Sequence, residues 1–423
     1  CSRQRVRRCS GGTKQKMKIV LVHRHGPGQF VHLACHLANA GWQVSFLCEA
    51  MNVRLPGIRT LRQPATPPPP AMPFAQYHQE VGLKAAKTLD SLVREEGVPD
   101  IVYGHIGWGS MMFARDVLPE TPLIGYCEHY YHATGRDVGF APDEDITLAK
   151  RTQLRLRNAA QLATLDQLDA AISPTRWQKS AFPVAYHHKI GVCHEGVDTR
   201  RCRPNPNAEL TLPDGRVLGA EDQVITYVAR DLEPYRGFPT FMRAAAKLAK
   251  ENPDAVFVVA GGDGISYGQP RADGRKWRDV MLEETGIDRS RIHFLGQIPH
   301  DQLIRMYQIS SAHIYLTYPF VLSWSMLEAM ACGAPVITSD TGPCQEVIRD
   351  GQNGFFTDFW DSETLAEKMA FCLTRKNDLG RMRGQARKTI IDHFDLELCL
   401  DKQTSLLERM VSADMGSSAR QRM

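Results

Sequence analysis

The amino-acid sequence predicts an α/β protein made of two doubly wound domains that face each other across a cleft. Three observations support this fold class. Short β-branched or apolar runs alternate with longer segments of helical period, which is typical of parallel sheets covered by helices on both faces. The alternation occurs twice, on either side of a polar stretch. The chain has 423 residues, more than the ~250 to 300 that one hydrophobic core serves.

The first set of elements begins at Met17. Short apolar runs predict strands at 18–22, 44–47, 101–103, 123–125 and 170–172. Apolar residues at helical spacing predict helices at 30–40, 77–95 and 148–162. Residues 64–73 are rich in proline, which predicts a loop.

The second set repeats the same architecture. Strands are expected at 224–228, 255–260, 292–294, 314–316 and 335–338. Helices are expected at 238–250, 277–285, 301–308 and 325–332. Parallel strands of such sheets end at one edge, and ligands bind there. We therefore expect the functional residues at the strand ends that face the cleft.

The polar stretch at 203–222 contains Pro, Asn, Gly and acidic residues with little apolar content, so we expect the interdomain linker there. The predicted organisation is a basic extension at 1–16, a domain at 17–202, the linker, a second domain at 223–390, and a helix and tail at 391–423. Residues 1–18 carry seven positive charges and no acid, so the overall net charge of +4 becomes −3 for the rest.

The composition excludes several classes of protein. With 43% hydrophobic and 23% charged residues the chain is globular, and the nearly neutral body does not indicate nucleic-acid binding. Eleven cysteines show neither a disulfide framework nor zinc-site spacing, so we expect reduced thiols, no metal and a cytoplasmic location. No apolar stretch is a convincing membrane span. The basic extension leaves peripheral contact with an anionic membrane open.

Two glycine-bearing turns follow predicted strands, around Gly28 and at Gly262-Asp263. Glycine lets the backbone approach a phosphate closely, so either turn could bind one. Considered singly, each turn is better explained as a structural turn. Arg230 and Arg236 lie between a strand end and a helix, where two guanidinium groups suit the oxygens of a diphosphate. A solvated loop with surface ion pairs is the alternative.

Residues 318–333 form the segment richest in candidates. Glu328 lies in an otherwise apolar helix, where a carboxylate is costly unless it is paired or accepts hydrogen bonds from a ligand. The two hydroxyls of a ribose are suitable donors, and a structural Glu–Arg pair is the alternative. Ser323, in the same segment just before the predicted helix, is a further candidate for ligand binding.

Taken together, these motifs closely resemble the family 4 glycosyltransferases, retaining enzymes of the two-domain GT-B fold. The resemblance runs from Met17 to about Phe394 and rests on 327–338, Glu346, 229–237, 293–296 and 195–198. The segments 28–30, 104–109, 173–178 and 318–325 resemble a bacterial subgroup with its own type of N-terminal domain.

The resemblance implies roles for individual residues. Arg230 and Arg236 match the pair that holds the donor diphosphate, and Glu328 matches the second Glu of the E-x7-E motif, which binds the ribose. Phe294, Leu295 and Ile298 lie in the segment that receives the base. Glu346 lies in a loop near the donor sugar and phosphates.

The sequence departs from the family pattern at Phe320, which stands where the first Glu of the motif contacts the donor sugar. A second ambiguity concerns Glu128 and His129. They lie nearest the position after the fourth strand of the N-terminal domain where many members of the family have a histidine. Either residue could contact the sugar or the acceptor, or both could form a structural pair. His105 also follows a strand, and acceptor contact and a structural role are equally compatible with it.

The resulting hypothesis is a hexosyltransferase that uses a UDP- or GDP-linked sugar, transfers with retention and needs neither cofactor nor metal. The acceptor would be a small molecule, a glycan or a lipid-linked molecule. A nucleotide-sugar epimerase of similar fold and a non-catalytic nucleotide-sugar-binding protein are the alternatives.

Overall fold

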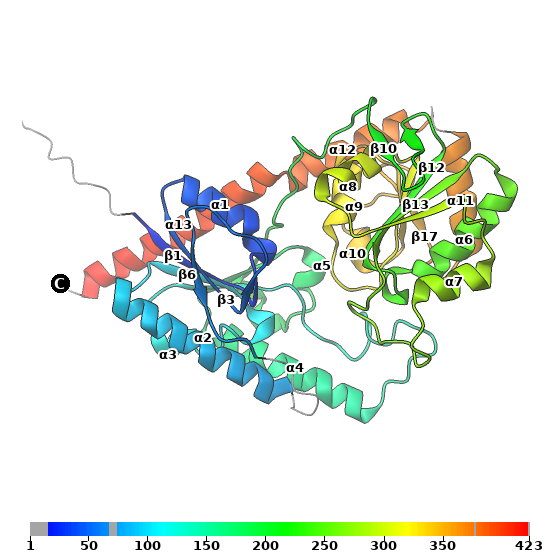
Figure 1. Cartoon of the computed structure of the whole chain (residues 1–423). Helices are drawn as coiled ribbons and strands as arrows, with labels where there is room; N and C mark the ends of the chain where they lie inside the picture. Colours follow the sequence, from blue (N-terminus) through cyan, green and yellow to red (C-terminus); the bar gives the residue numbers. More distant parts are fainter. Residues whose placement is uncertain (1–15, 67–73, 376–377, 422–423) are drawn as a thin grey trace, which may run out of the picture.

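The computed structural model describes residues 16–66, 74–375 and 378–421. The chain forms two lobes, one from its first half and one from its second, and the C-terminal helix returns to the first lobe (Figure 1). The expected basic extension lies outside the described residues except for Lys16, and so does part of the proline-rich loop.

The first lobe contains a fully parallel seven-stranded sheet in the order β5-β3-β1-β6-β7-β8-β9. The central strand β1 is a β-branched and apolar run, Lys18–Val22, in which Ile19 faces Val44 on one neighbour and Ile101 on the other. The remaining strands are β3 (Gln43–Cys48), β5 (Arg59–Arg62), β6 (Ile101–His105), β7 (Leu123–Tyr126), β8 (Ala170–Ser173) and β9 (Ile190–Val192). β2 (His25–Gly26) and β4 (Ala50–Met51) form a separate short pair.

Helices cover both faces of this sheet. One face packs against α1 (Val31–Asn39) and α13 (Leu396–Gln421), and the other against α2 (Phe74–Glu96), α3 (Ala114–Val117) and α4 (Leu148–Gln167). Short helical turns connect the strands: η1 (Gly28–Phe30), η2 (Ile106–Trp108), α5 (Arg176–Lys179) and η3 (Val184–Lys189).

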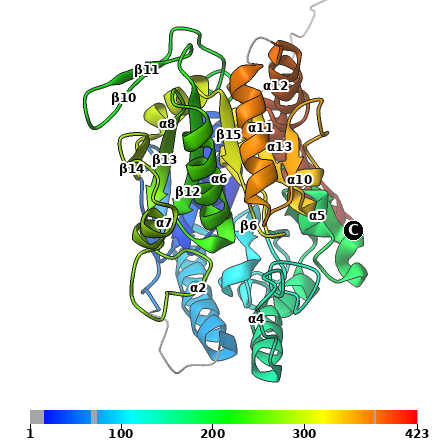
Figure 2. The same cartoon turned by 90° about the vertical axis from the view of Figure 1, so that its right-hand side faces the viewer.

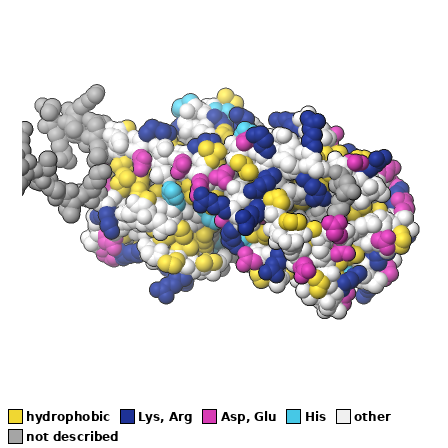
Figure 3. Space-filling model, turned by 90° about the horizontal axis from the view of Figure 1, so that it is seen from above, with side chains coloured by type: hydrophobic (Ala, Val, Ile, Leu, Met, Phe, Trp, Pro, Cys, Tyr) yellow, Lys and Arg dark blue, Asp and Glu magenta, His cyan; other side chains and the backbone are white. Residues whose placement is uncertain are grey.

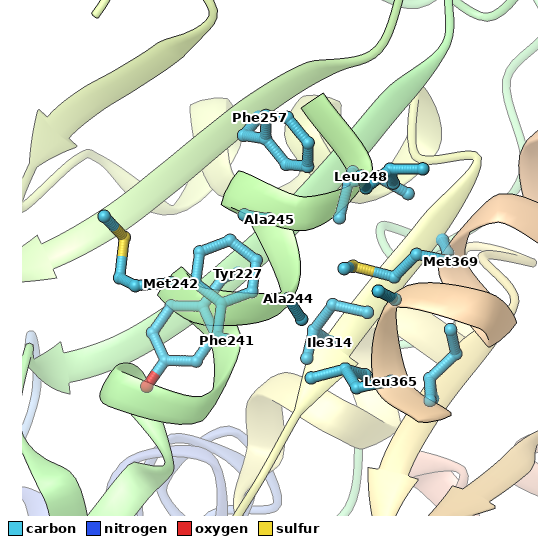
Figure 4. Packing of buried hydrophobic residues seen from close by; sticks show 14 of the residues in the cluster. Tyr227, Phe241, Met242, Ala244, Ala245, Leu248, Phe257, Ile314, Leu365 and Met369 are labelled. Atoms are coloured by element: carbon cyan, nitrogen blue, oxygen red, sulfur yellow. The ribbon is translucent and has the colours of Figure 1, made fainter. Parts of the chain in front are cut away.

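The second lobe contains a parallel six-stranded sheet in the order β14-β13-β12-β15-β16-β17. Its strands are β12 (Val224–Asp231), β13 (Val256–Gly262), β14 (Ile292–Gly296), β15 (Ala312–Tyr315), β16 (Val336–Ser339) and β17 (Phe355–Thr357). Figure 4 shows the core on one face, where Tyr227 and Phe241 stack next to Leu365 and Met369.

Helices α6 (Phe238–Glu251) and α11 (Ser362–Thr374) lie side by side over that core (Figure 2). The opposite face packs against α8 (His300–Gln308), α9 (Trp324–Ala331) and α12 (Gly380–Phe394). The other helical segments are η4 (Pro234–Arg236), α7 (Trp277–Thr285) and α10 (Gly342–Gln345).

The structure differs from the expected organisation at two places. Within 203–222, β10 (Glu209–Thr211) and β11 (Val217–Gly219) form an antiparallel hairpin, and Leu210, Leu212 and Leu218 are buried against the second sheet. Residue 391, the expected start of the last helix, lies inside α12, and α13 begins at Leu396. Leu400, Leu407 and Val411 of α13 are buried in the first lobe.

The carboxyl ends of both sheets meet between the lobes, where side chains that follow β7, β8 and β9 contact side chains that follow β12 and β15. Lysine, arginine and acidic side chains are spread over both lobes on the face seen from above (Figure 3). Among the described residues, no helix combines the length and the apolar character needed to cross a membrane.

Candidate active site

Arg236 is a buried cation at the ends of β12 and β15. The residue is only 7% exposed, and its guanidinium donates hydrogen bonds to Tyr315 Oη (3.1 Å) and Thr317 Oγ1 (2.5 Å). Within the described part of the chain no carboxylate lies within 4 Å of the guanidinium. Burying a charge without a counterion is costly, so this position favours an anionic ligand.

The short turn η4 places Arg236 at the strand ends. Gly237 follows it with φ +69°, and a Cβ atom there would collide with the Leu316 side chain. A glycine is therefore required for the chain to turn from η4 into α6. Arg230, the last but one residue of β12, is exposed, and its guanidinium lies 5.9 Å from the ring centre of Tyr267. The ring of Tyr267 also lies 4.9 Å from the guanidinium of Arg236, so one aromatic ring joins the two arginines.

Two acids between the arginines hold the loop that carries Tyr267. The buried carboxylate of Glu233 accepts hydrogen bonds from the backbone N–H groups of Ser266 (3.2 Å), Tyr267 (3.0 Å) and Gly268 (2.9 Å). Burial raises the pKa of Glu233, and these N–H groups and Arg236 oppose that rise. Asp231 accepts from Gly264 N–H (3.0 Å) and from the Ser266 hydroxyl.

The turn at Gly262 and Asp263 is used mainly within the protein. A Cβ atom at Gly262 would lie 2.5 Å from Asp231 Oδ1, so glycine is needed for the close approach of the two loops. Asp263 pairs with Arg278 (2.9 Å) and lies 3.6 Å from Lys276 Nζ. Since its carboxylate already has two cationic neighbours, Asp263 is better explained as a structural residue than as a phosphate contact.

Glu328 lies in α9 with its side chain 14% exposed, and it pairs with His300 at 2.8 Å. This hydrogen bond raises the pKa of His300, although burial opposes the rise. Helix α9 starts beside Arg236, because Tyr315 Oη accepts from both Arg236 and Ser323 N–H. Ser323 itself caps the helix through its hydroxyl.

Phe294, Leu295 and Ile298 lie at and just beyond the end of β14, and all three are half-buried. The Phe294 ring packs against Phe238, and the Arg278 guanidinium lies 5.6 Å from its centre. Leu295 and Ile298 pack against the cluster beneath the β10–β11 hairpin. The hairpin therefore supports the segment expected to receive a base.

Phe320 lies within a group of aromatic side chains at the junction of the lobes. Its ring contacts His129 (4.4 Å between centres), Tyr235 (5.6 Å) and Tyr267 (5.5 Å), and its carbonyl accepts from Trp177 Nε1 (2.9 Å). The position where the resemblance implies a glutamate is thus occupied by a ring that contacts residues of both lobes.

His129 and Tyr235 approach Asp137 from opposite lobes. Tyr235 Oη donates to the carboxylate at 2.8 Å, and His129 Nε2 lies 3.6 Å from it. Burial raises the pKa of Asp137, but the nearby His129 and the hydrogen bond from Tyr235 outweigh burial and hold that pKa below its ordinary value. The carboxylate is therefore ionised at neutral pH and links the two lobes.

The first lobe contributes a histidine–carboxylate group at the ends of β6 and β7. Gly107 N–H donates to His105 Nδ1, so Nε2 carries the proton and donates to Glu128 at 3.0 Å. Gln29 donates to the other carboxylate oxygen at 2.7 Å. Burial raises the pKa of Glu128, but His105, His23 and His129 together lower it by more than burial raises it. The Glu128 side chain is therefore a half-buried anion.

Gly28 has φ +50° and lies against His23, whose ring a Cβ atom would approach to 2.8 Å. This tight contact brings η1, and with it Gln29, next to Glu128. Burial, followed by the neighbouring His105, lowers the pKa of His23 to about 3, so this ring is neutral.

Glu346 stands at the end of the short helix α10 and contacts the first lobe. Its two carboxylate oxygens accept from the backbone N–H groups of Arg176 and Trp177 at the start of α5, each at 2.8 Å. Beside it is a cavity of about 380 Å³ whose lining includes Arg176, Arg349 and Lys402. In this structure Glu346 fastens the second lobe to the first.

The structure therefore brings the expected residues together in three groups: Arg230, Arg236, Phe320 and His129; Ser323 and Glu328; and Gly28, His105 and Glu128. Sequence reasoning missed Tyr267, Glu233, Asp137 and His300, whose roles depend on contacts between distant segments. Glu195, which accepts from Tyr126 and Trp324, was quoted only within a motif.

Comparison with known families covers most of the chain. Residues 40–202 match the profile described as "Glycosyl transferase family 4 group", and residues 214–389 match "Glycosyl transferases group 1". The relatives include D-inositol 3-phosphate glycosyltransferases of a Mycobacterium strain, 28% identical over 66% of this chain, and of Rhodococcus jostii, 27% identical over 47%. These matches span 60% and 43% of the relatives' own lengths.

Solved structures share the fold at low sequence identity. Sucrose-phosphate synthase from Thermosynechococcus elongatus has a TM-score of 0.72 and 20% identity, and the match covers 94% of this chain and all of that one. Anabaena HepE in complex with UDP-glucose has a TM-score of 0.70 and 16% identity, with 93% and 100% covered. The fold is GT-B.

Proposed function

We propose that this chain, which belongs to the family 4 glycosyltransferases, transfers a hexosyl group from a nucleotide diphosphate sugar to an acceptor hydroxyl with retention of configuration. The observation that carries the proposal is Arg236, a buried guanidinium without a carboxylate partner among the described residues, beside the exposed Arg230. Anabaena HepE was solved with UDP-glucose, which supports UDP as the first nucleotide to test.

The second lobe would hold the donor. Arg230 and Arg236 would bind the diphosphate, Glu328 would accept from the ribose hydroxyls, and the segment of Phe294 would receive the base. Tyr267, held by Glu233, lies between the two arginines and would keep their guanidinium groups in place. The aromatic group around Phe320 would pack against the hexose ring.

The proposed step breaks the bond between the anomeric carbon and the diphosphate oxygen, and the bonding electrons leave with the diphosphate. The acceptor oxygen forms the new bond from the same face, and its proton passes to the departing phosphate oxygen. The two arginines stabilise the charge that develops on the diphosphate, so the step needs no metal. Glu128, with His105 and Gln29 already bound to it, would orient a hydroxyl of the sugar or acceptor.

Binding and turnover test this proposal separately. A ligand that binds the folded state raises the melting temperature, so a screen of UDP, GDP, ADP and TDP sugars should single out one nucleotide. Incubation of that donor with candidate acceptors should release the nucleoside diphosphate and form an α- or β-glycoside whose anomeric configuration, read by NMR, equals that of the donor.

The alternatives give different results in the same assays. An epimerase would convert the donor without releasing the diphosphate, and a binding protein would shift the melting temperature without any turnover. If none of the nucleotide sugars shifts the melting temperature, the proposed donor site is wrong.

A further inference from the structure

A group of metal-ligand side chains surrounds Glu328. The sulfur of Cys202, a ring nitrogen of His300 and a carboxylate oxygen of Glu328 all lie within 4.8 Å of one another. The neighbouring Cys332 thiol, followed by burial, raises the pKa of Cys202, and Cys332 packs in the same buried cluster as Cys202, beside the group. Glu328 and Cys332 are one helical turn apart, so α9 presents both on the same face.

These four side chains are the donor types that zinc prefers. Thiolate, imidazole and carboxylate ligands bind Zn²⁺ in a tetrahedron, with bonds of about 2.0 to 2.3 Å and hence ligand atoms roughly 3.3 to 3.8 Å apart. The Cys202 sulfur would have to approach the other two ligand atoms by about 1 Å at most, whereas His300 Nε2 and Glu328 Oε1, now 2.8 Å apart, would have to separate slightly. The side chain of His300 is 42% exposed and can make that adjustment, and it also leaves the group open to solvent on one side.

The surroundings favour a cation bound to thiolates. Arg387 donates to the carbonyl oxygens of Cys202 (2.9 Å) and Ala331 (2.6 Å), and this fixes the backbone next to both thiols. The same guanidinium supplies one positive charge. The three negative charges of two thiolates and one carboxylate would balance the positive charges of Zn²⁺ and Arg387, so the group would have no net charge.

A buried hydroxyl points to a missing partner at the same place. The side chain of Tyr307 is fully buried, and its Oη has no hydrogen-bond partner among the described residues. Tyr307 packs in the same buried cluster as Cys202 and Cys332. A thiolate or carboxylate that is held as an anion by a metal would be a stronger acceptor for this hydroxyl than a neutral thiol.

We propose that Cys202, Cys332, His300 and Glu328 form a zinc site that the nucleotide donor and the metal cannot occupy together. The metal takes up Glu328, which the donor ribose needs, so bound zinc inhibits transfer and is not a cofactor. The mutual exclusion rests on the proposed function, whereas the metal site itself does not.

Cobalt tests the site directly, because tetrahedral Co²⁺ with thiolate ligands has strong visible bands and a near-ultraviolet sulfur charge-transfer band. The full chain, reduced with TCEP, is titrated with Co²⁺ and then with Zn²⁺. One equivalent of Co²⁺ should give both bands, and Zn²⁺ should abolish them. Cys202→Ser should abolish the charge-transfer band or weaken Co²⁺ binding at least 100-fold, and His300→Ala should weaken it at least 10-fold.

Cys372→Ser is the matched control, because Cys372 is an equally buried thiol in α11, outside the group. This variant should retain the bands and the affinity. His300→Ala removes an exposed ligand, so it remains informative if Cys202→Ser does not fold. Absence of the sulfur band in the wild type, or an unchanged band in Cys202→Ser, would overturn the site.

UDP, or the nucleotide selected by the screen, separates this inference from the proposed function. If the donor shares Glu328, saturating UDP should lower the apparent Co²⁺ affinity at least 10-fold. If UDP binds and leaves Co²⁺ binding unchanged, the mutual exclusion is wrong. If Co²⁺ binds and no nucleotide does, the proposed function fails and the metal site stands.

Discussion

A guanidinium in a protein interior destabilises the fold unless its charge is compensated. In the described structure Arg236 has no carboxylate within 4 Å, and it contacts the hydroxyls of Tyr315 and Thr317 and the ring of Tyr267. We expect Arg236→Met to leave the free energy of unfolding within about 1 kcal/mol of the wild type, or to raise it, because an apolar side chain of similar length replaces a buried charge. Nucleotide binding should weaken at least ~10-fold, since a charged hydrogen bond contributes about 1.5–3 kcal/mol.

Chemical denaturation and nucleotide titration measure these two quantities on the same protein sample. A loss of several kcal/mol in stability with unchanged nucleotide affinity would identify Arg236 as a structural residue. It would also remove the observation on which the donor site depends.

Arg230 has the opposite character, because it is exposed and its removal leaves no buried cavity. Arg230→Ala should lower kcat/KM about 10²- to 10³-fold through the loss of transition-state charge stabilisation, with little change in melting temperature. Arg243→Ala is the control, since Arg243 is an exposed arginine of α6 that pairs with Glu284. Equal kinetics for both variants would show that Arg230 acts as a surface residue.

Single residues were predicted best where the chain direction alone decides their position. Arg230 lies at the end of a strand and Arg236 and Glu128 follow strands, so the sequence placed them at a sheet edge. The partners could not be predicted in this way. His300 reaches Glu328 from 28 residues upstream, and Glu346 turns toward α5 of the other lobe, because side-chain contacts depend on packing between segments.

At the scale of elements, the loop from Gly264 to Gly268 has no regular structure and depends on Glu233 for its position. Glu233→Gln replaces one acceptor oxygen by a donor, which then faces backbone N–H groups. The loop should detach locally, at a cost of about 1 to 3 kcal/mol. Because Tyr267 then leaves the arginines, KM for the donor should rise more than kcat falls.

Hydrogen exchange checks this prediction, since the amides of Ser266, Tyr267 and Gly268 should exchange faster in the variant. Asp273→Asn is the control: Asp273 is an exposed acid in the following stretch that pairs with Arg271. Unchanged exchange at the three amides in Glu233→Gln would show that other contacts hold the loop.

Sequence reasoning missed the long helices α11 and α12 and several elements that are short or interrupted. The edge strand β9 has three residues, too few for a pattern. In the β10–β11 hairpin, apolar and polar residues alternate only over 208–212, before the turn at Pro213 and Gly215. Such a segment has the composition of a linker. Its apolar side becomes evident only when the second sheet provides a surface on which Leu210 and Leu218 are buried.

At the scale of the whole molecule, two sheets were predictable because each carries its own core pattern, whereas their mutual attachment was not. The last helix, α13, leaves the second lobe and buries Leu400, Leu407 and Val411 in the first. Amphipathic spacing predicts such a helix without indicating which lobe it covers. The GT-B arrangement follows from the strand order and from contacts such as Tyr235 with Asp137.

The two lobes share a further property, which is a set of buried neutral histidines. Burial lowers the pKa of His23 and of His313 to about 3 and that of His78 to about 4. In the unfolded chain each titrates near 6.5, so below that pH the unfolded state binds protons that the folded state does not. Stability therefore falls as the pH drops from about 6.5 toward the folded pKa values.

Each of these histidines should cost about 1.4 kcal/mol at pH 5.5, and the three together roughly 4 kcal/mol, a large part of the usual 5–15 kcal/mol. His300 opposes this with its raised pKa, but it is one group and half exposed.

Denaturant unfolding at pH 7.5 and at pH 5.5 measures the loss. His313→Gln should reduce the difference between the two pH values by about 1.4 kcal/mol, because one titrating group is removed. His188→Gln, at an exposed position, should leave the difference as in the wild type. Equal stability at both pH values would mean that these rings take up protons in the folded protein.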